Sequence, residues 1–545
     1  MSHDQITRTP LPRNEPVREY SPGSAERASL KATLRAMAGA DPLEIPARIG
    51  GELIETGKLG EAHAPHDHAR LLARFHKCGA AEVRHAIAAA GKVHRDWSAM
   101  AWPDRAAVFL KAAELLAGPF RDRMNAATML GQSKTVYQAE IDAACELIDF
   151  WRFNAQYMRQ VYEEQPASAP GIWNRLEHRP LEGFVLAVTP FNFTSIAGNL
   201  PTAPALMGNT VLWKPASTSI LSAHVIMEVL EAAGLPAGVI NLLPGDGPDV
   251  GNPALASPEL AGIHFTGSTG TFQAMWRKIG ENIAGYRSYP RIVGETGGKD
   301  FVFAHPSAEI EPLVTALLRG AFEYQGQKCS AASRAFIPAS LWDSVLDALT
   351  AQVAQIRMGS PLDFRNFMCA VIDAKSYASI TGYLDHARGA DDHEIVQGGK
   401  SDDTTGWFIE PAVVVADAPD TKLMREEIFG PVLTLYRYPD KRMDAALEAA
   451  DRASPYALTG AIFCRDRSEI ARLTSALRFA AGNFYINDKP TGAVVGQQPF
   501  GGGRASGTND KAGSALNLVR WVSPRAIKET FAPPVDFRYR HMAEE

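Results

Sequence analysis

Two segments of the sequence carry the side chains needed to attack a carbonyl group and then hydrolyse the product. Cys329 lies among small residues in FEYQGQKCSAASR, where a carbonyl can reach the sulfur and a backbone N–H together. Glu295, in IVGETGGKD, ends a predicted strand and precedes two glycines, so its carboxylate can move as a general base must. The pair predicts a thiol nucleophile whose thioester is hydrolysed with help from a carboxylate.

A cysteine protease is an alternative for a lone reactive thiol, and it would need a histidine partner. His224, His264 and His305 lie in no local pattern typical of such a partner. His264 falls inside the apolar run AGIHFTGS, so it is predicted to be a core residue. The sequence therefore favours carboxylate-assisted thioester chemistry over proteolysis.

Length and charge limit the class of protein and its partners. At 545 residues the chain can form two or more packed units. A net charge of -6, without a long Lys/Arg block, argues against nucleic acid or an anionic membrane as main partner and favours a small-molecule substrate. No apolar run approaches the roughly 20 residues that span a bilayer. The N-terminal stretch mixes acids with arginines and has no apolar signal-peptide core, so we expect a cytoplasmic location.

The sequence contains five cysteines, which are scattered along the chain and form no CxxC pair. This usage suits a reducing compartment and predicts neither a disulfide frame nor a metal site. Cys78, Cys145, Cys369 and Cys464 are expected to be small buried residues of the core. Cys329 is therefore the one candidate for chemistry.

The chain pattern changes twice, and each change indicates a different part of the fold. Residues 80–160 show the three-and-four spacing of amphipathic helices. Short apolar runs at 183–190, 209–215, 238–245, 261–268 and 291–296 then alternate with helical stretches, which predicts a parallel, doubly wound sheet that binds ligands at the carboxyl ends of its strands. A second alternating region between about 297 and 500 predicts a separate α/β domain, with the active site in the cleft between the two.

Neither GxGxxG nor GxxxxGK[ST] occurs, so a nucleotide cofactor would have to be held in another way. Gly245, Gly247 and Gly251 have the wrong spacing for the first motif and are, by themselves, more typical of turns. An isolated strand-like piece near the C-terminus is too short to be stable alone, and pairing with another subunit is one way to satisfy it.

Six motifs in order, TPFNFT, WKPAST, FTGST, ETGGKD, GQKCS and EEIFGPV, over roughly residues 80–530, resemble the aldehyde dehydrogenase superfamily. Within it, QAEIDAACELIDFWRFNA, FEYQGQKCSAASR and YINDKPTGAVVGQQPFGGGRASGTNDKAG resemble the delta-1-pyrroline-5-carboxylate dehydrogenases. The resemblance implies a doubly wound, Rossmann-like NAD-binding domain, an α/β catalytic domain and a small β oligomerisation arm. The predicted parts are a surface-wrapping segment (1–60), the NAD-binding domain (61–161 and 182–296), the catalytic domain (297–505) and a hairpin with a C-terminal strand (162–181 and 506–545).

The resemblance also implies a reaction, the NAD-dependent oxidation of L-glutamate gamma-semialdehyde to L-glutamate in proline catabolism by a homodimer. Cys329 would attack the aldehyde, Asn192 would hold the oxyanion with the Cys329 N–H, and Glu295 would activate the hydrolytic water. Oxidation of another semialdehyde is the alternative within this chemistry. A catalytically idle protein is an alternative from another class, and it need not keep all three residues.

The residues expected to hold NAD follow the same resemblance. Lys214 and Ser217 are expected at the adenine ribose, the 267–271 loop at the pyrophosphate, and Glu427 beside Phe429 at the nicotinamide ribose. NAD-preferring relatives often carry Glu where Ser217 stands; a Glu would repel a 2′-phosphate and Ser would not, so NADP use stays open. The full set is Thr189, Pro190, Phe191, Lys214, Ser217, Gly247, Gly251, Gly267, Ser268, Thr269, Gly270, Thr271, Glu427 and Phe429.

The substrate's amino acid end is expected to meet donors for its carboxylate and a partner for its ammonium. Ala493 stands where many relatives have Ser, so one hydroxyl is lost there. If the stretch around Cys329 is extended, the Lys328 side chain points to the opposite face. The full predicted set is Glu146, Phe193, Lys328, Ser330, Gly492, Ala493 and Phe500.

Overall fold

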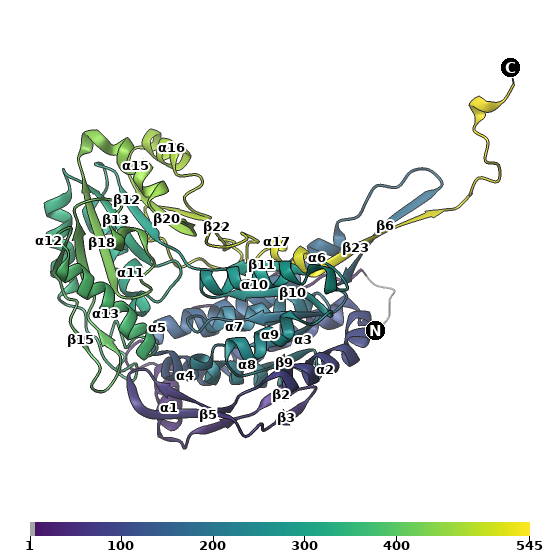
Figure 1. Cartoon of the computed structure of the whole chain (residues 1–545), viewed down its shortest axis with the longest axis horizontal. Coiled ribbons are helices and arrows are strands. Elements are labelled where there is room, and N and C mark those ends of the chain that lie inside the picture. Colours follow the sequence, from purple (N-terminus) through teal and green to yellow (C-terminus); the bar gives the residue numbers. More distant parts are fainter. Residues whose placement is uncertain (1–5, 545) are drawn as a thin grey trace.

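The computed structural model describes residues 6–544 of the chain. Residues 1–5, at the start of the predicted surface segment, and residue 545, at the end of the predicted arm, lie outside the described residues. Two α/β bodies lie side by side, and a thin two-stranded arm extends away from one of them (Figure 1). No helix in the described part of the chain is long and apolar enough to cross a membrane.

The first body is built on a seven-stranded sheet. Its strand order is β11-β10-β7-β8-β9-β2-β3, and the five strands from β11 to β9 are all parallel. The five strands that the sequence predicted are present as β7 (Phe184–Val188), β8 (Thr210–Lys214), β9 (Ile240–Leu242), β10 (Leu260–Thr266) and β11 (Arg291–Glu295). The predicted doubly wound parallel sheet is confirmed.

Alternation of side chains along β7 explains why helices cover both faces of this sheet. Val185 and Ala187 pack into a core with the helices on one face, whereas Phe184 and Leu186 pack into a different core on the other. The first face carries α7 (Thr194–Leu206) and α8 (Ile220–Ala233), with α3 (Trp102–Ala117), α4 (Arg121–Gln132) and α6 (Leu147–Glu163) beyond them. The second face carries α2 (Ala80–Ala99), α9 (Gly247–Leu255) and α10 (Thr269–Glu281).

The helical pattern predicted for residues 80–160 is present, with one irregularity. Between α5 (Val136–Ala139) and α6 the chain forms a π-helical turn, Glu140–Glu146. Single π turns inserted between α-helices are frequent at functional sites. This one faces the N-terminus of α7.

The second body is built on another seven-stranded sheet, in the order β14-β17-β18-β13-β12-β20-β21. All neighbours are parallel except β14 and β17. The strands are β12 (Asp300–Ala304), β13 (Ala332–Pro338), β14 (His393–Gln397), β17 (Ala412–Ala416), β18 (Val432–Tyr438), β20 (Thr459–Phe463) and β21 (Asn483–Ile486). Helices α11 (Ile310–Phe322) and α12 (Trp342–Val353) cover one face, and α15 (Met443–Arg452) and α16 (Arg467–Ala476) cover the other.

The prediction that residues 1–60 only wrap the surface is wrong for much of the described segment. Helix α1 (Ala25–Gly39) buries Leu30 and Leu34 in the main core. Strand β2 (Ala47–Ile49) pairs with β9 and with β3 (Glu52–Ile54), so it extends the first sheet. Three-residue strands are too short to show periodicity, and the partner β9 is distant in the sequence, so no local pattern revealed them.

The arm differs from the predicted hairpin near 162–181. That segment contains one strand, β6 (Ile172–Pro180), and its antiparallel partner is β23 (Val522–Thr530). The pair extends from the body, and the C-terminal chain continues beyond it (Figure 1). The sequence identified both segments that form the arm but did not predict that they pair with each other. A contact between strands so far apart in the chain leaves no local signal.

Candidate active site

Cys329 follows a tight turn in which three consecutive residues have a left-handed backbone conformation. The preceding Tyr324, Gln325 and Gly326 all have positive φ, at 52°, 55° and 66°. A side chain at Gly326 would collide with the carbonyl oxygen of Gly430, so this position requires glycine. Tyr324 and Gln325 pay a conformational cost of about 1–2 kcal/mol each, which their contacts must offset.

Glu295 ends β11 and faces this turn. The Cys329 Sγ lies 3.8 Å from the Glu295 Oε1. Burial raises the pKa of Glu295 to about 7, while the Cys329 thiol and the charge of Lys511 lower it. Burial and the neighbouring carboxylate of Glu295 raise the pKa of Cys329, so the resting sulfur is a thiol. The Glu295 carboxylate, which lies within reach of the thiol proton, is thus poised near neutral pH.

Asn192 approaches the same turn from the other body. It follows β7 and precedes α7, and it is 3% exposed. Its side-chain Nδ2 donates a hydrogen bond to the Gln327 carbonyl oxygen at 3.1 Å. The predicted trio of Cys329, Glu295 and Asn192 therefore meets at one place, although it comes from three distant segments.

A cavity of about 390 Å³ opens onto the Cys329 sulfur. The N-terminal segment contributes Asn14, Glu15 and Val17 to its wall, which the sequence did not predict. All seven residues predicted to contact the substrate line it: Glu146, Phe193, Lys328, Ser330, Gly492, Ala493 and Phe500.

Two residues of this cavity have environments that the sequence did not reveal. The Ser330 hydroxyl lies 2.8 Å from the Thr491 hydroxyl, so Thr491 orients the group expected to meet a carboxylate. Burial and the nearby Asp142 raise the pKa of Glu146 to about 8, and Ser195 donates to its Oε2 at 3.0 Å. Glu146 is therefore mostly protonated at neutral pH and offers a hydrogen bond rather than a full charge.

The stretch around Lys328 is not extended, so the condition under which Lys328 and Cys329 would point to opposite faces is not met. Residues 328–331 form a turn, in which the Ala331 N–H donates to the Lys328 carbonyl oxygen at 3.1 Å. Lys328 and Cys329 consequently line the same cavity rather than opposite faces. The Lys328 ammonium is paired with Glu323 at 3.1 Å.

The residues predicted to bind NAD lie in two places. Most lie at the carboxyl edge of the first sheet, and Glu427 and Phe429 lie on the part of the second body that faces this edge. Phe191, after β7, meets the ring of Phe429 edge-on, with ring centroids 5.9 Å apart. Glu427 accepts a hydrogen bond from the Gly298 N–H at 2.9 Å, and a side chain at Gly297 would collide with its carboxylate. The remaining predicted members lie at the end of β8, in the turns after β7, β8 and β10, in α9, or in the first turn of α10: Thr189, Pro190, Lys214, Ser217, Gly247, Gly251, Gly267, Ser268, Thr269, Gly270 and Thr271.

The turn after β10 leads directly into α10. Ser268 caps α10 by accepting from the Thr271 N–H at 3.3 Å, and Gly270 has open space beside its Cα. In the turn after β8, the Ser217 hydroxyl donates to the Gly245 carbonyl oxygen at 3.4 Å. Burial lowers the pKa of Lys214, and nearby Asp246 opposes this effect.

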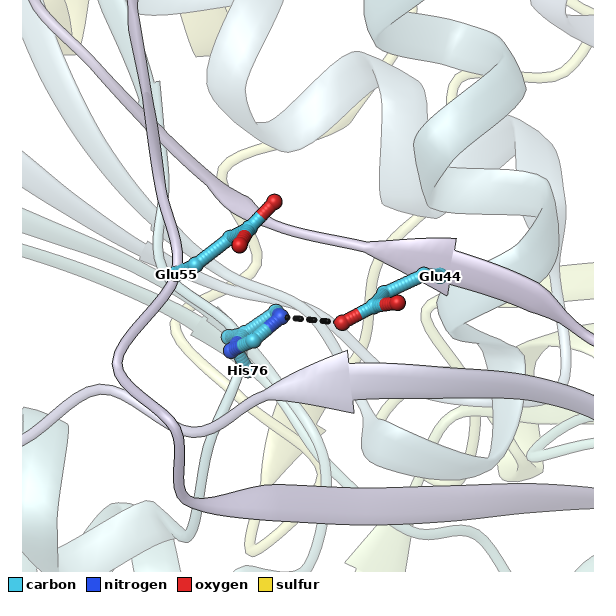
Figure 2. Close-up of side chains that lie close together, drawn as sticks. All are labelled: Glu44, Glu55 and His76. Carbon is cyan, nitrogen blue, oxygen red and sulfur yellow. Dashed lines mark hydrogen bonds and ion pairs between the residues drawn. The ribbon is translucent and has the colours of Figure 1, made fainter.

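One trio of side chains among the described residues is close enough to hold a metal ion: Glu44, Glu55 and His76. Figure 2 shows His76 bonded to Glu44, with Glu55 beside them. The His76 Nε2 lies 2.9 Å from the Glu44 Oε1, and its Nδ1 accepts from the Gly57 N–H at 3.2 Å. Because both ring nitrogens are engaged, this histidine ties β1 (Leu43–Ile45) to the end of β5 (Asp67–His76), and we assign no metal to it.

Comparison with known proteins agrees with this geometry. The family model described as "Aldehyde dehydrogenase family" matches residues 55–523. This chain belongs to the aldehyde dehydrogenase family. Delta-1-pyrroline-5-carboxylate dehydrogenase of Dictyostelium discoideum, named as mitochondrial, is 51% identical, over 100% of this chain and 98% of its own length. The human mitochondrial protein of that name is 47% identical, over 97% of this chain and 94% of its own length.

Solved structures resemble this aldehyde dehydrogenase over nearly its full length. The Delta-pyrroline-5-carboxylate dehydrogenase from Mycobacterium tuberculosis, described as bound with NAD, has a TM-score of 0.96 and 55% identity, covering 99% of this chain and 100% of that one. A 1-pyrroline-5-carboxylate dehydrogenase from Thermus, described as having bound NAD, has a TM-score of 0.90 and 31% identity, covering 96% of this chain and 100% of that one.

Lys511 is a further charged residue near Glu295. Its Nζ donates to the carbonyl oxygens of Gly482 at 2.8 Å and Gly501 at 2.9 Å, so the ammonium is fixed. It lines a small cavity together with Glu295, Glu146 and Asp510. The fixed positive charge favours the Glu295 carboxylate and keeps its pKa from rising further.

Replacing Lys511 by Met should therefore shift the acid limb of the activity profile toward alkaline pH. In the role predicted for Glu295 the active form is the carboxylate, and without Lys511 a larger fraction is protonated below about pH 7. The turnover rate there should fall several-fold, while the alkaline plateau is kept. A pH profile of kcat for Lys511→Met beside Lys511→Arg, which keeps the charge, measures this; identical profiles for Met and wild type would remove Lys511 from the account.

Proposed function

We propose that this aldehyde dehydrogenase uses Cys329, Glu295 and Asn192 to oxidise L-glutamate gamma-semialdehyde to L-glutamate with NAD, in proline catabolism. The semialdehyde is in equilibrium with cyclic delta-1-pyrroline-5-carboxylate. The observation that carries the proposal is the placement of Cys329, whose sulfur lies 3.8 Å from Glu295, in the wall of a cavity that is also lined by Ser330, Gly492 and Ala493. The names of relatives close to 50% identical over the whole chain support the same substrate.

The first half of the reaction forms a bond between sulfur and the aldehyde carbon. Glu295 receives the thiol proton as the Cys329 sulfur attacks, since its pKa of about 7 lets it accept a proton near neutral pH. The aldehyde oxygen becomes an oxyanion, and the Asn192 amide and the Cys329 N–H are the donors suited to it. Such a donor contributes about 3–4 kcal/mol of transition-state stabilisation.

The chemistry that bound NAD supplies is acceptance of the hydride from the former aldehyde carbon, which leaves a thioester on Cys329. Glu295 releases the thiol proton to solvent and then, again as a carboxylate, takes a proton from water as the water adds to the thioester carbonyl. Collapse of the tetrahedral adduct breaks the carbon–sulfur bond and releases the acid, which loses its proton to solvent to give the carboxylate product. The departing sulfur takes the proton held by Glu295 and becomes a thiol again. One carboxylate thus manages both proton transfers, which explains its place beside the sulfur.

The residues present fit a dinucleotide. The turn at Gly267–Thr271 exposes the N-terminal amides of the long helix α10, which suit pyrophosphate oxygens. Lys214 and Ser217 would hold the adenine ribose, and Glu427, kept in place by Gly298, would hold the nicotinamide ribose. Ser217 carries no charge that would repel a 2′-phosphate, so NADP is an outcome that a cofactor comparison must check.

The cavity also suits an amino acid end group. Ser330, oriented by Thr491, and the backbone amides of Gly492 and Ala493 would take the carboxylate. Phe193 and Phe500, on the cavity wall, would enclose the aliphatic chain. Glu146 would accept a hydrogen bond from the ammonium through its carbonyl oxygen rather than form a full ion pair, because its pKa is about 8.

The arm formed by β6 and β23 supports a homodimer. This two-stranded ribbon extends away from the body, and Trp173 and Phe531 on or beside it are 49% and 64% exposed. A second copy would cover such a ribbon. Five free, buried cysteines suit a reducing compartment such as the cytoplasm, whereas several relatives are named as mitochondrial.

A substrate panel tests the proposed function. Formation of NADH and of NADPH is followed with delta-1-pyrroline-5-carboxylate, succinic semialdehyde and a simple aliphatic aldehyde. The proposal expects the highest kcat/KM with delta-1-pyrroline-5-carboxylate and NAD. A higher value with succinic semialdehyde would assign the enzyme to the other semialdehyde.

A further inference from the structure

Lys134 is a fully buried lysine beside the active site that the chemistry above does not use. Its side chain is 0% exposed, and its Nζ lies 2.6 Å from the Oδ2 of the equally buried Asp142. Burying two charges costs several kcal/mol before their attraction is counted, so such a pair adds little net stability compared with apolar residues. The contacts of Lys134 and Asp142 are therefore a better guide to their role than their contribution to stability.

Asp142 holds the start of the helix that follows the oxyanion donor. It lies in the π-helical turn, and its two carboxylate oxygens accept from the backbone N–H groups of Thr194 and Ser195, each at 2.9 Å. These are the first two residues of α7, and they come directly after Asn192 and Phe193. A carboxylate at this end satisfies free N–H groups and the helix dipole together. The position of Asn192 is thus anchored through Asp142.

Lys134 contacts both of the turns that form the site. Its ammonium lies 4.3 Å from the ring centroid of Phe193, next to Asn192. It also lies 4.5 Å from the ring centroid of Tyr324, which has positive φ in the turn before Cys329. Both are cation–π distances, and such contacts are strongest where water is excluded.

The two residues before Lys134 connect the same two turns. The Gln132 Nε2 donates to the Thr194 hydroxyl at 2.8 Å. The Ser133 carbonyl oxygen accepts from the Gln325 Nε2 at 3.1 Å. The segment 132–134 therefore contacts the Asn192 turn and the Cys329 turn on consecutive residues.

We propose that Lys134 and Asp142 are positioning residues that hold the Asn192 turn and the Cys329 turn in register, so that oxyanion donor and nucleophile face one carbonyl group. The inference rests on the proposed function of this site. Neither side chain lines the cavity, so they act through Asn192 and Cys329 rather than by touching the substrate. A displacement of about 1 Å between such groups can cost on the order of a hundredfold in rate.

A double-mutant cycle between Lys134→Met and Asn192→Ala tests the proposal. Lys134→Met should lower kcat with delta-1-pyrroline-5-carboxylate by roughly 10- to 100-fold, with little change in NAD affinity. In the Asn192→Ala background the same substitution should cost less than about 3-fold, because the donor that it positions is already gone. Losses that multiply fully would overturn the proposal. Arg48→Met, which removes the ion pair to Glu231 at the far edge of the sheet, is the control and should show no coupling.

A second variant keeps the test decisive if Lys134→Met fails to fold. Lys134→Met combined with Asp142→Asn removes both charges and leaves one oxygen to accept from α7. It should show the same loss of kcat and the same weak effect in the Asn192→Ala background. Full wild-type kcat in this double variant would show that the pair does not position the site. If the wild type had no activity on any semialdehyde, the proposed function would be wrong. That result is distinct from every outcome of the double-mutant cycle.

Discussion

Replacing Glu295 by Gln should leave an enzyme that forms NADH once per active site and then nearly stops. Gln is close to Glu in shape but cannot accept a proton, so the thioester on Cys329 would persist. Loss of a general base typically costs about 10²- to 10⁴-fold, so steady-state turnover should fall by that factor. The initial burst should also be slower, because the same carboxylate receives the thiol proton at 3.8 Å. Rapid mixing with delta-1-pyrroline-5-carboxylate and excess NAD measures both phases.

A matched control for this experiment is Glu146→Gln. Glu146 is a carboxyl group in the same cavity, but its pKa of about 8 means that it is mostly neutral during turnover. Its Gln variant should form NADH over many turnovers without a burst, even if KM rises. Multiple rapid turnovers in Glu295→Gln would show that another group activates the water.

Replacing Asn192 by Ala should lower kcat by about 10²- to 10³-fold, which corresponds to one lost oxyanion donor. Asn192 is buried, and its Nδ2 already points at the nucleophile turn, where it donates to the Gln327 carbonyl oxygen. The donor is most important when charge develops on the substrate oxygen, so kcat should fall far more than NAD affinity does. Steady-state kinetics and a fluorescence titration with NADH separate the two effects.

Asn192→Asp distinguishes the loss of a donor from the loss of volume. Asp keeps the shape but, when ionised, brings a negative charge where the oxyanion forms. It should be at least as impaired as Asn192→Ala. Near-normal turnover in Asn192→Asp would assign the oxyanion to other donors.

The sequence predicted those parts of the structure that repeat locally or carry family motifs. The parallel strands after residue 183 were found because each is a short apolar run that ends at a turn. Cys329, Glu295 and Asn192 were predicted to act together because residue type and motif coincide, and the structure brings them close to one another. His264 was assigned to the core, and in the structure it is 3% exposed, with its Nδ1 2.9 Å from the Leu200 carbonyl oxygen.

The features that the sequence missed depend on contacts between distant segments. Thr491 can orient Ser330 only because the two hydroxyl groups lie 2.8 Å apart. Lys511 can influence the pKa of Glu295 only because the chain folds back to it. Asp142 lies in a stretch predicted to be helical and Lys134 in the short connection between α4 and α5, and charged residues at such positions normally face water. Their burial results from packing of the π-helical turn against α7, and no periodicity in the sequence predicts this packing.

The most direct measurement is the mass of the acyl-enzyme in Glu295→Gln. The variant is mixed with NAD and delta-1-pyrroline-5-carboxylate, quenched in acid, digested and analysed by mass spectrometry. We predict a glutamyl thioester on the peptide that carries Cys329, in an amount equal to the NADH formed. An adduct on Cys145, which lines the same cavity, or NADH formation with Cys329 unmodified, would contradict the assignment of Cys329 as the nucleophile.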